Sequence, residues 1–119
     1  MSQGQTVQFW GLKTCDTCRK ASRALEAAGL TVETRDVRAD GVPTESLERW
    51  VAQMGWETLL NTRSTTWRGL ADTDKADLDT QKAVALMLNN PTLIKRPVIE
   101  TNDTLLVGWT KDVQSALGL

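Results

Sequence analysis

The stretch that decides the fold is Val7-Gln-Phe-Trp-Gly-Leu-Lys-Thr-Cys-Asp-Thr-Cys18. Its apolar first part, residues 7–10, predicts a short strand, the residues after it predict a loop, and a helical pattern begins at about Asp16. Cys15 is then expected at the exposed N-terminal tip of the helix, with Cys18 roughly one turn inward and within disulfide reach. Unpaired backbone N–H groups and the helix dipole at that tip favour a thiolate over a thiol. This arrangement is typical of a redox dithiol.

The side-chain composition limits how such a thiolate can be stabilised. The sequence has 2 cysteines and no histidine, which excludes a Cys–His pair and every zinc site that contains histidine. Two cysteines alone cannot complete a typical four-ligand structural zinc site, so no metal is expected. Stabilisation must come from the helix terminus and from the nearby cationic side chains, which are Lys13, Arg19, Lys20 and Arg23. Asp16 acts in the opposite direction, because a carboxylate beside a thiolate raises the pKa of the thiol.

The length, the charge and the polar first residues indicate the cellular location and the partners to expect. The 119 residues suit a single domain, and neither a signal peptide nor an apolar run as long as a membrane span is visible. A closely spaced cysteine pair without a secretion signal is typical of a catalytic or redox-sensing site, because the cytosol keeps ordinary disulfides reduced. A net charge of −1 argues against non-specific nucleic-acid binding. We therefore expect a cytoplasmic protein that binds neither membranes nor nucleic acids directly.

A β-α-β unit is predicted at the start of the chain. The helical spacing of apolar residues continues to residue 28, where Gly29 is a natural C-terminal stop. Residues 30–37 predict a second strand. A strand, a crossover helix and a second strand this close together make a parallel pair.

Helices dominate the middle of the chain, and two strands and a helix follow them. The predicted elements are, in chain order, a helix capped by Thr44 and ended by Gly55, a short helix at residues 56–60, a helix capped by Asp79 and ended by Asn90, strands at residues 98–101 and 104–107, and a helix capped by Thr110. The polar residues 61–68 predict no regular element. Asn102-Asp103 is a two-residue connection of the kind that joins antiparallel strands.

This order of elements is that of a thioredoxin-like fold. The sequence predicts one α/β domain over residues 1–119, with β-α-β and then β-β-α around a mixed four-stranded sheet. An all-helical insertion is predicted at approximately residues 42–91. In such a fold the active site lies at the tip of the first helix, opposite the loop before the third strand. That position brings Arg96 and Pro97 beside Cys15.

Four blocks of sequence carry a resemblance to a known family. They are Gly11-Leu-Lys-Thr-Cys-Asp-Thr-Cys-Arg-Lys20, Gly55-Trp-Glu-Thr-Leu-Leu-Asn-Thr-Arg63, Thr65-Thr-Trp-Arg68 and Lys95-Arg-Pro97. With these blocks the sequence resembles the ArsC/Spx family of thioredoxin-like proteins, and most closely its YffB-like branch. The blocks run from near the start of the chain into its last third, so the resemblance covers nearly the whole domain.

The resemblance implies a thiol reductase in which Cys15 is the nucleophile and a small thiol or disulfide is the substrate. The residues expected to bind the substrate are Lys13, Thr14, Arg63, Arg96 and Pro97. The two arginines would bind an oxyanion or carboxylate, and the proline would follow a cis peptide bond. Glutathione is the expected co-substrate, and no tightly bound cofactor is implied.

Two roles remain open for Cys18. It can resolve a mixed disulfide formed on Cys15, or it can be a core-facing cysteine that never forms a disulfide. In either case we expect Cys15 to be the more acidic thiol, because buried apolar surroundings raise the pKa of a thiol one turn inside the helix.

Two departures from the family pattern count against arsenate as the substrate. The family's arsenate reductases use a further arginine in the last strand region, where this sequence has Leu105-Leu-Val-Gly-Trp109. They also carry a histidine four residues before the cysteine, where this sequence has Gly11. The alternative to a reductase is an Spx-like redox-sensing transcriptional regulator, which shares the Cys-x-x-Cys motif and binds RNA polymerase.

Overall fold

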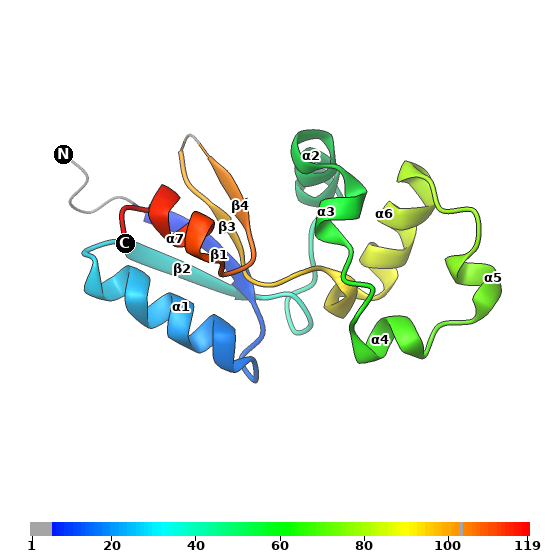
Figure 1. The fold of residues 1–119 in the computed structure, drawn as a ribbon, viewed down its shortest axis with the longest axis horizontal. Helices are drawn as coiled ribbons and strands as arrows, with labels where there is room; N and C mark the ends of the chain where they lie inside the picture. Colours follow the sequence, from blue (N-terminus) through cyan, green and yellow to red (C-terminus); the bar gives the residue numbers. More distant parts are fainter. Residues whose placement is uncertain (1–5, 103) are drawn as a thin grey trace. The chain divides into compact units, whose positions relative to one another are not determined.

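The computed structural model describes residues 6–102 and 104–119 and divides the chain into two compact units (Figure 1). One unit combines the chain up to Val37 with the segment from Arg96 onward, and we call it the sheet unit. The other runs from Arg38 to Lys95, and we call it the helical unit.

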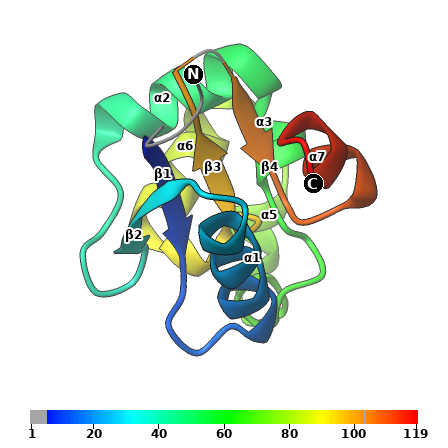
Figure 2. The same cartoon turned by 90° about the vertical axis from the view of Figure 1, so that its left-hand side faces the viewer.

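The sheet unit contains a mixed four-stranded sheet. Its strands are β1 (Thr6–Gly11), β2 (Thr31–Asp36), β3 (Val98–Glu100) and β4 (Leu105–Val107), in the spatial order β2-β1-β3-β4 (Figure 2). β1 pairs in parallel with β2 and antiparallel with β3, and β3 pairs antiparallel with β4. The prediction of an α/β, thioredoxin-like sheet is confirmed.

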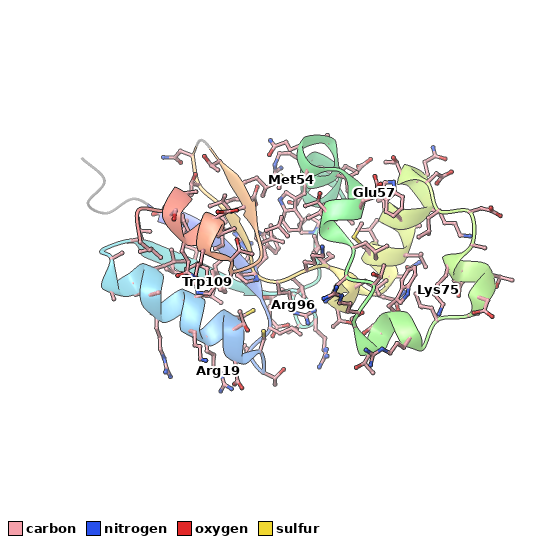
Figure 3. All side chains as sticks on the ribbon, in the orientation of Figure 1. Arg19, Met54, Glu57, Lys75, Arg96 and Trp109 are labelled. Atoms are coloured by element: carbon pink, nitrogen blue, oxygen red, sulfur yellow. The ribbon has the colours of Figure 1, made fainter. Side chains whose placement is uncertain are left out.

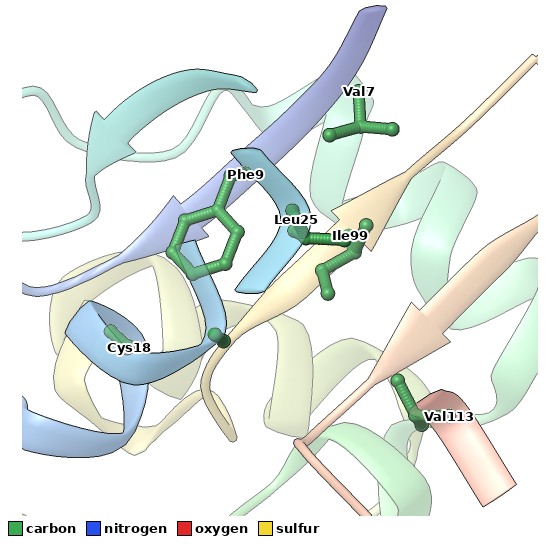
Figure 4. Packing of buried hydrophobic residues seen from close by; sticks show 7 residues of the cluster. Val7, Phe9, Cys18, Leu25, Ile99 and Val113 are labelled. Carbon is green, nitrogen blue, oxygen red and sulfur yellow. The ribbon is translucent and has the colours of Figure 1, made fainter. Parts of the chain in front are cut away.

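Two helices of the sheet unit, α1 (Asp16–Ala27) and α7 (Lys111–Ala116), pack on one face of the sheet. The buried side chains that join them to the strands are Val7, Phe9, Cys18, Ala21, Leu25, Ile99 and Val113 (Figure 4). Those on α1 recur at spacings of three and four residues, which places them on one side of the helix. The helix ends just before Gly29, as predicted, and the φ of 90° at Gly29 suits a residue without a Cβ atom.

The strands β3 and β4 form the predicted antiparallel pair. At their connection, the Thr101 N–H donates a hydrogen bond to the Thr104 carbonyl at 2.9 Å. Asp103, one of the two predicted turn residues, lies outside the described residues. The closing helix begins at its predicted cap, because the Thr110 hydroxyl accepts a hydrogen bond from the Val113 N–H at 3.1 Å.

The helical unit is built from short helices. They are α2 (Thr44–Met54), α3 (Trp56–Leu59), α4 (Thr65–Arg68), α5 (Asp72–Lys75), α6 (Thr80–Asn89) and the 3₁₀ helix η1 (Pro91–Leu93). Asp79 caps α6 as predicted, with its carboxylate accepting a hydrogen bond from the Lys82 N–H at 2.8 Å. Among all residues that the structure describes, no helix is long and apolar enough to cross a membrane.

Two features of the helical unit differ from the prediction. Residues 61–68, predicted to have no regular element, contain α4, which begins where the Ser64 hydroxyl accepts a hydrogen bond from the Trp67 N–H at 3.1 Å. The predicted N-cap Thr44 is instead the first residue of α2, because the extended backbone of Pro43 already precedes the helix there.

Candidate active site

The two cysteines lie at the start of α1 at different depths. Cys15 is the N-cap residue of the helix and is half-buried, whereas Cys18, in the first turn, has only 3% of its surface exposed. Both are free thiols. The Cys15 N–H donates to the Leu12 carbonyl at 3.1 Å, and the Arg19 N–H donates to the Cys15 carbonyl at 3.1 Å. The cysteine loop therefore turns directly into the helix.

The pKa of the Cys15 thiol is lowered from its ordinary value. Burial opposes this shift, because it disfavours the charged form and raises the pKa. The opposing interactions are stronger together: the sulfur accepts hydrogen bonds from the Cys18 N–H, the Cys18 thiol and the Thr17 N–H, and the Arg96 guanidinium adds a favourable charge. The thiolate is thus stabilised without a histidine.

The Cys18 thiol is shifted in the opposite direction. Burial, the largest cause, raises the pKa of Cys18 to about 11, and the hydrogen bond that its thiol donates to Cys15 and the repulsion between the two sulfurs add to the effect. The Leu12 N–H and the Arg96 charge lower the pKa but do not compensate. The two thiols therefore differ in acidity in the order predicted from their positions in the helix. Environments that separate the acidity of two neighbouring groups are typical of active sites.

Arg96 and Pro97 lead into β3, and the peptide bond between them is cis. This confirms the prediction made from the family resemblance. The Pro97 carbonyl accepts a hydrogen bond from the Gly108 N–H at 2.8 Å, which ties the segment to the residue after β4. The Arg96 side chain, labelled in Figure 3, is half-buried. Its charge acts on both thiols. Within the sheet unit, the segment before β3 and the cysteine loop therefore meet.

The buried carboxylate of Asp36 accepts a hydrogen bond from the cysteine loop. No local sequence pattern predicts this role. Asp36, the last residue of β2, is 9% exposed, and its Oδ2 atom accepts a hydrogen bond from the Lys13 N–H at 3.1 Å. The neighbouring Val37 N–H donates to the Gly11 carbonyl at 2.9 Å. The parallel register sets Asp36 opposite Gly11, so sheet pairing places this carboxylate beside the loop.

Replacing Asp36 with alanine is expected to loosen the loop. The Lys13 N–H would lose a charged acceptor, and hydrogen bonds to charged groups contribute about 1.5–3 kcal/mol to stability. Urea denaturation should show a fall of that size in the free energy of unfolding. The matched change Glu26→Ala, at an exposed position of α1, should alter it by less than about 0.5 kcal/mol. Equal effects of the two changes would contradict this role of Asp36.

The other side chains of the cysteine loop face solvent. Lys13 and Thr14 are both exposed, so they are accessible to a substrate, and their predicted binding role stays a prediction. On the first turns of α1, the Arg19 guanidinium donates to the Asp16 carboxylate (Figure 3). The Arg19 guanidinium thereby neutralises the Asp16 carboxylate at the start of the helix.

Arg63 belongs to the helical unit, and its predicted role in binding the substrate stays a prediction. Its surroundings are a polar pocket of about 560 Å³ lined by Trp56, Glu57, Leu60, Asn61, Thr62, Arg63 and Lys95. The Arg63 N–H donates to the Asn61 side-chain carbonyl at 3.0 Å, and the Lys95 N–H donates to the Leu59 carbonyl at 2.8 Å. The lining therefore holds two cationic side chains and one carboxylate, Glu57, and this positive excess suits a carboxylate or an oxyanion.

A thioredoxin-like sheet with an acidic thiol at the tip of its first helix defines the class of this protein. A model of the ArsC family matches residues 10–117, so the chain belongs to the ArsC family. This confirms the family predicted from the sequence.

Individual relatives agree with this membership. The solved structure of a protein named YFFB (PA3664) is 42% identical, with a TM-score of 0.88, and the match covers 93% of this chain and 97% of that one. An uncharacterized protein of Haemophilus influenzae is 39% identical over 92% of this chain and 97% of its own length. The global transcriptional regulator Spx of Staphylococcus aureus is 27% identical over 89% of this chain and 82% of its own length.

Proposed function

We propose that the protein is a thiol-dependent reductase in which Cys15 is the nucleophile. The observation that carries the proposal is the difference in acidity between two thiols one helical turn apart, with the pKa lowered at Cys15 and raised to about 11 at Cys18. The thiolate is the attacking species in thiol–disulfide exchange, and a thiol of lower pKa is also the better leaving group. Membership of the ArsC family supports the same chemistry.

The proposed reaction begins with a disulfide substrate. The Cys15 thiolate attacks one sulfur of the substrate, a mixed disulfide forms on Cys15, and the other substrate sulfur leaves as a thiolate. Either Cys18 or glutathione then attacks the Cys15 sulfur and releases the remaining substrate thiolate. Each departing thiolate takes up the proton that an attacking thiol has lost. The attack by Cys18 leaves a Cys15–Cys18 disulfide, and the attack by glutathione leaves a mixed disulfide of Cys15 with glutathione. Further glutathione reduces either bond, which restores the Cys15 thiolate and releases glutathione disulfide. Overall, two glutathione thiols supply two electrons and end as glutathione disulfide.

The cationic group at the thiols favours a substrate that carries a carboxylate. Arg96 lies at the thiols. Arg63 and Lys95 share a separate polar pocket of the helical unit. A guanidinium group can donate two parallel hydrogen bonds to a carboxylate. Glutathione carries two carboxylates and is abundant in the cytoplasm, which we propose as the place where the protein works. No tightly bound cofactor takes part in this proposal.

A coupled assay tests the reductase proposal. The protein is incubated with a small aliphatic disulfide and glutathione, and the glutathione disulfide that forms is reduced by glutathione reductase while NADPH consumption is followed. We expect a rate that is proportional to protein concentration and exceeds uncatalysed exchange. A rate no higher than that of the protein-free mixture would contradict the proposal.

Arsenate reduction is expected to be weak or absent. The last strand region, Leu105–Trp109, supplies no arginine to hold the oxyanion. Each lost charged hydrogen bond costs about 1.5–3 kcal/mol, which is roughly a tenfold to hundredfold loss of rate. Arsenate turnover with glutathione should be compared with that of an established arsenate reductase of the family. Comparable rates would show that this prediction is wrong.

Similarity to Spx supports a second candidate, a redox-sensing regulator of transcription. The cysteine pair would then report oxidation, and the protein would bind RNA polymerase. A regulator should co-purify with RNA polymerase and show no turnover in the coupled assay. A reductase should turn over the disulfide whether or not polymerase is present.

A further inference from the structure

The Cys18 thiol lies directly against the backbone of Gly11. A Cβ atom added at Gly11 would be 2.8 Å from Cys18 Sγ, 3.2 Å from Cys18 Cβ and 3.1 Å from a ring carbon of Phe9. A separation below 3.0 Å is one that real Cβ atoms essentially never show, so the thiol would have to shift. Phe9 is 1% exposed and Cys18 is 3% exposed, so the two neighbours have little free space around them.

Space, rather than backbone conformation, is what favours glycine at this position. Gly11 is not among the glycines with a positive φ, and it has an ordinary place at the end of β1, opposite Asp36. Gly29 and Gly55 show the opposite case, because their φ values are 90° and 83° and an added Cβ would meet nothing within 4 Å. At Gly69 an added Cβ would make ordinary contacts of 3.6 Å. Among the described glycines, Gly11 is the one at which an added Cβ would clash with a thiol.

We propose that Gly11 is a positioning residue for Cys18: the missing side chain leaves the space in which the Cys18 thiol reaches the Cys15 sulfur. The inference rests on the proposed reductase function and concerns its closing step. In that step Cys18 attacks the Cys15 sulfur of the mixed disulfide, the Cys15–Cys18 bond forms, and the substrate thiolate leaves with the proton that Cys18 has lost. A methyl group at position 11 displaces the thiol from the position where it donates a hydrogen bond to Cys15.

The closing step can be measured with glutathione disulfide as the probe. Reduced protein is mixed with glutathione disulfide and quenched with acid at intervals, and mass spectrometry separates the mixed disulfide on Cys15 from the Cys15–Cys18 disulfide. In the wild type we expect fast closing and little mixed disulfide. In Gly11→Ala we expect the mixed disulfide to accumulate, because closing should be roughly fivefold to hundredfold slower, the range that corresponds to ordinary overpacking of a core.

A matched glycine variant controls for the substitution itself. Gly69→Ala adds the same methyl group where its contacts are ordinary, so it should close at the wild-type rate. Equal closing rates in Gly11→Ala and Gly69→Ala would overturn the inference and leave the reductase proposal intact. A wild type that forms no Cys15–Cys18 disulfide would also overturn it, while turnover with glutathione in the coupled assay would still support the reductase.

A stability comparison covers the case in which Gly11→Ala folds poorly. Gly11→Ala should lower the urea midpoint strongly in the wild type and less in a Cys18→Ala background, because that background lacks the sulfur 2.8 Å from the added Cβ. A Gly11→Ala chain that does not fold should regain a folding transition when Cys18→Ala is added. An equal loss of stability in both backgrounds would overturn the inference, since the clash would then not involve the thiol.

Discussion

Replacing Cys15 with serine is expected to abolish disulfide turnover, with a loss of about a thousandfold or more. A serine hydroxyl is not ionised near neutral pH, and removal of the nucleophile from a covalent catalyst can cost up to about 10⁶-fold in rate. The backbone N–H groups of Thr17 and Cys18 stay in place, so the fold should persist. The coupled glutathione assay measures the loss, and circular dichroism checks the fold.

The companion variant Cys18→Ser separates the two routes for the second half of the reaction. If Cys18 resolves the mixed disulfide, this variant should accumulate the adduct on Cys15 and turn over more slowly. If glutathione resolves it, turnover should persist. Activity that survives in Cys15→Ser would assign the nucleophile to another group and contradict the proposed mechanism.

Limited alkylation near neutral pH is expected to label Cys15 on the order of a hundredfold faster than Cys18. With a pKa of about 11, Cys18 is ionised at pH 7 in roughly one molecule in ten thousand, whereas the lowered pKa of Cys15 gives that thiol a much larger thiolate fraction. The stronger nucleophilicity of the more basic thiolate offsets only part of this difference in thiolate fraction. Burial of Cys18, which is 3% exposed, limits access and widens the difference again. Peptide mapping by mass spectrometry gives both rates.

The pH dependence of Cys15 labelling provides a check on its cause. Because the sequence contains no histidine, the rate should rise through one thiolate titration and then level off. A lowered pKa places the midpoint of this rise below that of an ordinary thiol. Arg96→Ala removes a favourable charge and should move the midpoint upward, whereas Arg23→Ala, at an exposed position of α1, should not. A bell-shaped profile, or faster labelling of Cys18, would contradict the assignment.

Local sequence patterns were sufficient to predict the element that carries the thiols. The boundaries of α1 follow from the helical spacing of Ala21 and Leu25 and from the stop at Gly29. The caps at Asp79 and Thr110 were equally predictable, because a capping side chain only needs an N–H group three residues further along the chain. The cis bond before Pro97 came from the family resemblance, since its position alone does not determine the isomer.

Two contacts that depend on the exact register or packing of distant segments could not be predicted. The carboxylate of Asp36 reaches the cysteine loop because of the parallel register of β1 and β2, which the residues around Asp36 do not reveal. The contact between Gly11 and Cys18 likewise arises only when α1 packs on β1. The short helices α4 and α5 escaped prediction for another reason, because a single turn is too short to show a periodic pattern.

The Arg96 charge that lowers the pKa of the thiols is missing while the chain is being synthesised. Synthesis proceeds from the N-terminus, so Cys15 leaves the ribosome well before Arg96 exists. Until β3 has joined β1, the thiols lack this guanidinium, and Cys18 lacks its full burial beneath the helix. A nascent or unfolded chain therefore carries two nearly equivalent cysteines of ordinary reactivity. Cys15 becomes the attacking thiol and Cys18 the buried one only after β3 and β4 have joined the sheet.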